Sequence, residues 1–413
     1  MSAWAPAARS AEARRVYAAA EADRAERPQR YRLGVEALGA VVETATAGRD
    51  PAGLGDPDQW RPGLEHYLAS ADEDGRLNAL GARMVRDTAV GRLRARAALA
   101  GYTREHPTVP ERALRPPIVI VGGWRTGTTL VFRTLARDPR LRAPLPVELS
   151  APWRMAGLRD GDREARIDAS APAHDLLHLL NPTMAVVHDS GPRMPEECVL
   201  GMGTTLRNWA FPSTVRLDGY ARWLAGEDFA AEYAAHRTML QILDDGRRWV
   251  LKAPAHTAEL AHLAATYPGA CLVWLHRDIV DTVASGASLF ATYRATYSDH
   301  VDAADVGRFQ TEQTELWLRR AVAFRSTPLA RAVTIVDVAY GELLAAPAAV
   351  LRRVYDAAGL DPPDTAALLE AQRRDAPRHA HGTHRYRPQD FGIDPAALRD
   401  RMAFYTDRLP AGG

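Results

Sequence analysis

The protein has 413 residues, of which 46% are hydrophobic and 25% charged, a composition typical of globular proteins with one large or two modest domains. The net charge of +1 argues against nucleic acid or an anionic membrane surface as partners. Cys198 and Cys271 are the only cysteines, which excludes a disulfide scaffold and favours a reducing compartment, the cytoplasm. No window approaches about 18 uninterrupted apolar residues, so neither a signal peptide nor a membrane span is expected.

The first part of the chain, residues 1–114, is predicted to be a helical region that packs on the rest. Alanine-rich helical patterns cover residues 11–27, 64–70 and 77–102. Several prolines between residues 107 and 117 then interrupt the helical pattern and precede an apolar, β-branched run. We therefore expect a second region, an α/β domain, over residues 115–413.

Short apolar runs that alternate with helical patterns predict the sheet of this domain. The runs lie at residues 118–121, 249–251, 271–275 and 333–338. Such alternation predicts a central parallel sheet with helices on both faces, a three-layer α/β fold. Residues 155–245 lack strand patterns and are expected to form a helical insertion, in which Met194–Glu197 has the pattern of a helix start.

The strand at 118–121 runs into a glycine-rich turn with the sequence Gly122-Gly123-Trp124-Arg125-Thr126-Gly127-Thr128-Thr129. The glycines allow backbone N–H groups to approach an anion, and a helix that starts near Gly127 directs its positive end toward the same place. The spacing fits the phosphate-binding loop of nucleotide triphosphatases, but Thr128 occupies the lysine position and the cation is Arg125 instead. A glycine turn that only joins a strand to a helix is the structural alternative.

Two further apolar runs end in basic residues. Arg277 follows the strand at 271–275, and Ser285 lies eight positions later, about two helical turns, so its hydroxyl can return to the anion that Arg277 holds. The alternative is that Arg277 pairs with Asp278 or Asp281.

The strand at 249–251 ends at Lys252, with His256 at the start of the next helix. Both are expected at the same sheet edge as the glycine-rich turn. The alternatives are a solvated surface lysine and a histidine that only caps a helix.

Together these segments resemble the bacterial branch of sulfotransferases that use 3′-phosphoadenosine 5′-phosphosulfate (PAPS). The resemblance rests on the segment Arg125-Thr126-Gly127-Thr128-Thr129, on Arg277 with Ser285, and on the spacing of Lys252, Pro254 and His256. It implies a P-loop-like α/β fold and the transfer of a sulfuryl group to a hydroxyl of a small molecule.

In that family the loop binds the 5′-phosphosulfate and the Arg–Ser pair the 3′-phosphate. The resemblance therefore assigns donor binding to Arg125, Thr126, Gly127, Thr128, Thr129, Arg277 and Ser285. It places Lys252 and Arg125 at the transferred group and His256 where it can take the hydroxyl proton. His256, whose pKa is expected near neutrality, ranks slightly ahead of Glu148 as the base.

Two positions depart from the animal cytosolic members of the family: Leu130 replaces a tryptophan that stacks on adenine, and their C-terminal Arg-Lys-Gly motif is missing. Arg385 or a residue of the insertion is the alternative for completing the nucleotide site. No metal is expected, and the histidines at 379–384 are interpreted as part of a loop. A phosphate-loop kinase or NTPase and a repurposed nucleotide-binding module are the alternative functions.

Overall fold

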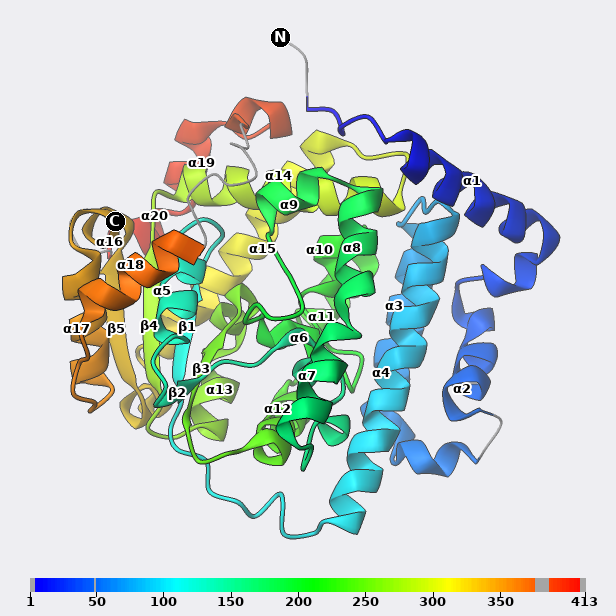
Figure 1. The fold of residues 1–413 in the computed structure, drawn as a ribbon. Coiled ribbons are helices and arrows are strands. Elements are labelled where there is room, and N and C mark those ends of the chain that lie inside the picture. Colours follow the sequence, from blue (N-terminus) through cyan, green and yellow to red (C-terminus); the bar gives the residue numbers. More distant parts are fainter. Residues whose placement is uncertain (1–3, 48–49, 376–385, 409–413) are drawn as a thin grey trace.

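The structure, a computed structural model, describes residues 4–47, 50–375 and 386–408. Its centre is a parallel sheet of five strands in the order β2-β3-β1-β4-β5. The strands are β1 (Ile118–Gly122), β2 (Leu141–Arg142), β3 (Arg248–Lys252), β4 (Cys271–His276) and β5 (Thr334–Ala339). Figure 1 shows the sheet at one side of the molecule, and the predicted α/β fold class is confirmed.

Four of the five strands coincide with apolar runs in the sequence, because they are rich in β-branched or aromatic residues, and three of them, β1, β3 and β4, are largely buried. Strand β2 was not predicted, since two residues are too short to form a pattern. The register pairs Ile120 with Lys252 on one side and with Val273 on the other. All strands therefore end at a common edge, which collects the loop after β1, Lys252 and the residues after β4.

Side chains of β1 alternate between two hydrophobic clusters, as a strand covered on both faces requires. Ile118 and Ile120 pack with helices α5 (Thr128–Leu135), α17 (Pro347–Ala357) and α18 (Thr365–Asp375). Val119 and Val121 belong to the larger cluster on the opposite face. That cluster includes side chains of α13 (Leu260–Thr266), α14 (Ile279–Tyr297) and α15 (Ala303–Phe324).

The larger cluster continues into the N-terminal helices. These are α1 (Ala11–Glu26), α2 (Leu38–Thr46), α3 (Arg61–Glu73) and α4 (Ala79–Glu105). Val41, Leu64 and Val85 are buried in the same cluster as Val119. The described N-terminal residues therefore share a core with the sheet, and Figure 1 shows their helices on the side of the molecule away from it. A domain boundary near residue 115 stays a prediction.

Helices and irregular segments fill the chain between β2 and β3. The helices are α6 (Pro146–Ser150), α7 (Asp160–Asp168), α8 (Ala171–Leu180), α9 (Thr183–Val187), α10 (Phe211–Thr214), α11 (Asp218–Leu224) and α12 (Ala230–Leu243). The helix start predicted at Met194–Glu197 is wrong, because Glu196 and Glu197 lie outside any helix and precede the short 3-10 helix Cys198–Leu200. Their carboxylates are thus available for contacts with the sheet edge.

The remaining helices are α16 (Tyr340–Ala345), α19 (Pro395–Arg401) and α20 (Ala403–Thr406). Among the described residues, no helix combines the length and the apolar character that crossing a bilayer requires. The histidines at 379–384 and Arg385 lie in the segment 376–385, outside the described residues.

Candidate active site

The loop between β1 and α5 has the backbone of an anion cradle. Gly122 and Gly127 have positive φ values of 136° and 94°, and Arg125 also lies in the left-handed region with φ 63°. The Thr126 hydroxyl donates to the Gly123 carbonyl over 2.8 Å, which closes the loop on itself. Helix α5 begins at Thr128 without a side-chain cap, so its first N–H groups remain available to an anion.

Gly127 is required for both its conformation and its contacts. A Cβ atom there would overlap the side chain of Leu343 on α16, and its φ of 94° is one that other residues rarely adopt. Gly127→Ala is expected to reshape the loop and weaken nucleotide binding by at least about tenfold, because a misplaced binding group loses most of its interaction. Calorimetry with 3′,5′-adenosine bisphosphate measures this. Gly101→Ala, in a helix with open space around the new methyl group, is the control, and equal affinities in the two variants would contradict the expectation.

The two predicted arginines meet at this loop. Arg125 is exposed, while an Nη of Arg277 donates to the Arg125 carbonyl oxygen over 3.0 Å. The other Nη of Arg277 pairs with Asp281 at 2.8 Å, which is the contact considered as the structural alternative, and its guanidinium lies 4.5 Å from the ring centroid of Tyr340. Arg277 thus combines an ion pair with direct contact to the loop.

The hydroxyl residues predicted for donor binding lie on the two helices that start at this edge. Thr128 and Thr129 form the first turn of α5, where Thr128 is buried and Thr129 exposed. Ser285 is 5% exposed and lies two turns into α14, the helix that follows Arg277. The structure therefore brings the loop residues and Arg277 together and places Ser285 deeper along α14.

Lys252 ends β3 beside the loop. Its Nζ lies 2.5 Å from Oε1 of Glu197 and 3.4 Å from the Thr129 hydroxyl, and the residue is 4% exposed. Of the 52 lysine and arginine residues in the chain, it is the only lysine. A buried ammonium on a flexible stem, held between the Glu197 carboxylate and the Thr129 hydroxyl, differs chemically from the planar guanidinium of the other basic residues. The expected alternative, a solvated surface lysine, is wrong.

A second ion pair lies next to Glu197. The His188 Nε2 is 3.6 Å from Oε2 of Glu196. Burial would raise the pKa of Glu196, but His188 and the charge of Lys252 outweigh it and lower that pKa to about 2. Burial would lower the pKa of His188, but the charge and hydrogen bond of Glu196 raise it above its usual value. The edge near Lys252 therefore carries two carboxylates, the lysine ammonium and an imidazole whose protonated form is favoured.

His256 lies deeper than expected. It is 1% exposed, its Nδ1 lies 2.7 Å from the Tyr233 hydroxyl, and its Nε2 is buried without a partner among the described residues. Burial, and secondarily the neighbouring His236, lower the pKa of His256 to about 3. The expectation that His256 titrates near neutral pH is therefore wrong, and a base with so low a pKa has little tendency to accept a proton.

We expect His256 and His236 to make the protein less stable in acid. Burial also lowers the pKa of His236, to about 4, so between these values and about 6.5 the unfolded chain binds more protons than the folded one. The stability from keeping both imidazoles neutral is complete above about pH 6.5. It decreases as the pH falls, by up to about 1.4 kcal/mol per pH unit for each histidine.

Urea unfolding between pH 4.5 and 7.5 measures this dependence. His236→Asn should reduce the slope of the unfolding free energy against pH, since the variant lacks one of the two groups. The matched control is His66→Asn at an exposed histidine. Equal slopes for the His236 variant and the unchanged protein would show that His236 does not titrate differently on folding.

Glu148 is engaged in a structural ion-pair cluster. It is 0% exposed, and its Oε1 pairs with Arg142 at 2.6 Å and also with Arg163. Its Oε2 accepts the backbone N–H of Leu145 over 2.8 Å and so caps α6. Both oxygens are occupied by cations or a helix start, which differs from the free carboxylate expected of a base. These contacts favour a structural role for Glu148.

Comparisons with known proteins show which family the chain resembles. The model of the sulfotransferase family matches residues 116–364, from just before β1 to the start of α18. The chain belongs to the sulfotransferase family. The omega-hydroxy-beta-dihydromenaquinone-9 sulfotransferase Stf3 of Mycobacterium tuberculosis (strain CDC 1551 / Oshkosh) is 26% identical over 275 residues. That alignment covers 59% of this chain and 63% of Stf3, so the chain spans less than two thirds of the curated relative.

Two solved structures resemble this sulfotransferase over most of its length. The sulfotransferase STF1 of Mycobacterium tuberculosis H37Rv has 26% identity and a TM-score of 0.76, covering 89% of this chain and 98% of STF1. STF9 of Mycobacterium avium has 25% identity and the same TM-score of 0.76, covering 91% of this chain and 97% of STF9. The fold and family predicted from the sequence are thereby confirmed.

The sequence analysis assigned no role to Glu197, which pairs with Lys252 in this sulfotransferase. Its segment was interpreted as a helix start, and the ion pair joins two segments that are distant in the sequence. Within residues 4–47, 50–375 and 386–408, no group of three or more His, Cys, Asp or Glu side chains is arranged to hold a metal.

Proposed function

We propose that this sulfotransferase transfers the sulfuryl group of PAPS to a hydroxyl of a small-molecule acceptor. The observation that carries the proposal is the position of the only lysine, Lys252, which lies between Glu197 and Thr129 at the edge where the phosphate-type loop ends. A cation, a carboxylate and a set of free N–H groups at one place are what the transfer of an anionic group to a hydroxyl requires.

The donor would be held at two positions along this edge. The N–H groups of residues 126–129 and the side chain of Arg125 would bind the 5′-phosphosulfate, with the positive end of α5 directed at it. Arg277, with Ser285 further along α14, would bind the 3′-phosphate. The contact between Arg277 and the Arg125 carbonyl supports a single donor that spans both positions.

In the transfer step the acceptor oxygen attacks sulfur and the bond from sulfur to the bridging phosphate oxygen breaks. Negative charge develops on that bridging oxygen, and the product is 3′,5′-adenosine bisphosphate. Lys252 would stabilise this charge, and Glu197 would take the hydroxyl proton. The distance of 2.5 Å between the Lys252 ammonium and the Glu197 carboxylate supports these two roles. An anionic donor that binds here would compete with Glu197 for the ammonium. The carboxylate would then be free to accept the hydroxyl proton.

Glu197 replaces His256 as our first candidate for the base, and His256 is the second. Glu197 contacts the lysine at the loop, whereas His256 is bonded to Tyr233 and has its pKa lowered to about 3. The cations of the chain would carry the charge that magnesium carries in phosphoryl transfer. The relative Stf3 is named for a hydroxylated menaquinone, so we propose an apolar acceptor with a terminal hydroxyl.

Mass spectrometry tests this function. The protein is incubated with PAPS and a panel of hydroxylated compounds that includes isoprenoid alcohols, fatty alcohols, sterols, phenols and glycosides. The expected result is an acceptor that gains about 80 daltons together with one equivalent of 3′,5′-adenosine bisphosphate, with or without EDTA. A parallel reaction with ATP and magnesium tests the kinase alternative, and phosphorylation of an acceptor there would contradict the proposal.

A further inference from the structure

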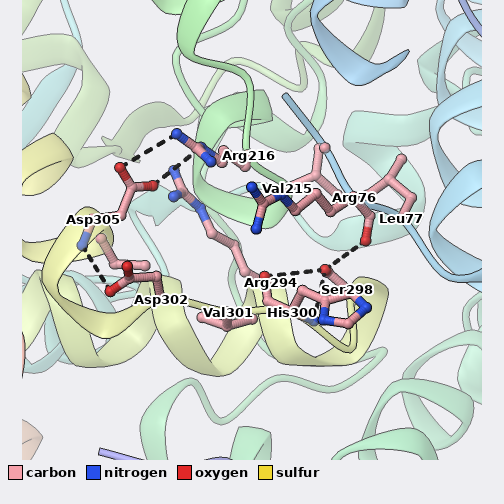
Figure 2. A pocket seen from close by; sticks show the side chains of 12 residues that line it. Arg76, Leu77, Val215, Arg216, Arg294, Ser298, His300, Val301, Asp302 and Asp305 are labelled. Atoms are coloured by element: carbon pink, nitrogen blue, oxygen red, sulfur yellow. Dashed lines mark hydrogen bonds and ion pairs between the residues drawn. The ribbon is translucent and has the colours of Figure 1, made fainter. Parts of the chain in front are cut away.

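A pocket lies far from the candidate active site, where the N-terminal helices meet α14 and α15. Its lining comes from the turn between α3 and α4, the turn between α10 and α11, the end of α14 and the start of α15. Figure 2 shows the guanidinium groups of Arg76, Arg216 and Arg294 directed into this region from three of these elements. Arg294 lies 15 residues beyond Ile279, roughly 22 Å along α14 from the end that carries the proposed donor site.

Arg294 is the buried cation of the pocket. It is 3% exposed, and one Nη donates to the Pro212 carbonyl over 2.9 Å. Its Nε is buried without a hydrogen-bond partner, and no carboxylate among the described residues lies within 4.0 Å of its guanidinium. Burial lowers its pKa to about 10, so it remains a cation near neutral pH. A buried guanidinium with an unused donor is costly unless an anion or water completes it.

Two of the acidic residues nearby, Asp218 and Asp305, are already paired with other arginines. Asp218 pairs with Arg216 at 2.8 Å, and Asp305 pairs with Arg216 at 3.1 Å and with Arg308 at 2.6 Å. Asp302 accepts two backbone N–H groups at the start of α15. Asp218 and Asp305 attract Arg294 at longer range, but Arg216 and Arg308 repel it. The lining of the pocket thus carries three guanidinium groups, those of Arg76, Arg216 and Arg294, and two carboxylates, those of Asp302 and Asp305.

Among the described residues, Arg76 is a second arginine of the pocket without an ion pair. It is exposed, lies in the turn between α3 and α4, and forms no ion pair within the described ranges. Its backbone is fixed at the pocket, because the Ser298 hydroxyl donates to its carbonyl oxygen over 2.7 Å. Arg76 and Arg294 therefore supply guanidinium donors from two sides of one small space, one exposed and one buried.

The size of the pocket selects the ligand. The cavity is small, about 30 Å³, which is room for two or three water molecules or for one small polyatomic ion. Guanidinium forks match the oxygen spacing of tetrahedral oxyanions better than they match a single-atom ion. We propose that the pocket binds a small inorganic oxyanion, phosphate or sulfate, between Arg76 and Arg294.

Such an ion would link the N-terminal helices to the core, because Arg76 belongs to the former and Arg294 to α14. Binding to the folded state alone raises the free energy of unfolding with ligand concentration. This site is independent of the donor site, and its occupation does not rest on the proposed function.

Calorimetric titration with inorganic phosphate tests the site at constant ionic strength. The titrated protein carries Arg125→Ala and Arg277→Ala, which removes the two cations of the proposed donor site. We expect one phosphate per chain, with the affinity lowered at least about tenfold by adding Arg294→Gln and several-fold by adding Arg76→Gln. Adding Arg159→Gln, at a solvated arginine that is 89% exposed, is the matched control and should leave the affinity unchanged.

Three results would overturn the proposal: no phosphate binding in the doubly substituted protein, an affinity that Arg294→Gln leaves unchanged, or equal binding of chloride. If the Arg294→Gln variant does not fold, the Arg76→Gln variant serves as the test, because Arg76 is exposed. An unchanged phosphate affinity in the Arg76→Gln variant would also overturn the proposal. Sulfate in place of phosphate should bind within a few-fold, because both present the same tetrahedral oxygens. Loss of all binding on removal of Arg125 and Arg277 would assign the anion to the donor site instead.

Discussion

Replacing Glu197 with glutamine is expected to lower the turnover number by about 10²- to 10⁴-fold and to leave the donor affinity within a few-fold of its original value. Glutamine keeps the size of the side chain and an oxygen beside Lys252, but it cannot accept the hydroxyl proton. Single-turnover sulfation at saturating PAPS and acceptor measures the chemical step directly.

Two further variants test whether the loss of turnover is specific to Glu197. His256→Asn removes the second candidate base while an amide can still contact Tyr233, and it should lower turnover much less than the Glu197 substitution does. Glu196→Gln removes the neighbouring carboxylate, which pairs with His188, and is the matched control. A normal rate in the Glu197 variant together with a large loss in the His256 variant would return the role of base to the histidine.

Lys252→Met is expected to lower the turnover number by about 10²- to 10³-fold, the usual cost of removing one donor that stabilises developing negative charge. Methionine fills the space of the lysine stem beside Phe132 but leaves the bridging oxygen without its cation. The variant also leaves Glu197 without its partner, so its fold is verified by thermal unfolding before the rate is compared.

A second variant, Lys252→Arg, separates the effect of charge from the effect of side-chain shape. Arginine keeps the charge, but its planar fork is larger than the ammonium that now lies 2.5 Å from Glu197, so we expect only partial recovery of activity. Arg248→Met, at the opposite end of the same strand, is the control for loss of a cation from β3. A Lys252→Met variant with unchanged turnover would remove the lysine from the reaction.

Local patterns were sufficient to predict most of the fold and the loop. Four strands are apolar runs that end at one edge, and the glycines that bend the chain after β1 are visible in the sequence because few other residues adopt positive φ there. The contact of Arg277 with the loop was also predictable, because the residues that follow neighbouring parallel strands lie at the same edge of the sheet.

The chemical environment of the site depended on contacts between distant segments, which patterns do not encode. Glu197 pairs with Lys252 from the insertion, 55 positions earlier in the chain, and no local pattern indicates that contact. The burial of His256 arises from packing with Tyr233 and His236 on α12. Glu148 comes after α5 in the chain, but its carboxylate forms ion pairs with Arg142 and Arg163.

The central claim is that one adenosine donor is bound by the loop after β1 and by the arginine after β4. Calorimetric titration with 3′,5′-adenosine bisphosphate tests it most directly, in the unchanged protein and in Arg125→Ala, Arg277→Ala and the control Arg159→Ala. We expect one molecule bound per chain, affinity reduced about tenfold or more by Arg277→Ala, a clear reduction by Arg125→Ala, and none by the control. Equal affinity in all four proteins, or equally tight binding of 5′-AMP, which lacks the 3′-phosphate, would contradict the account.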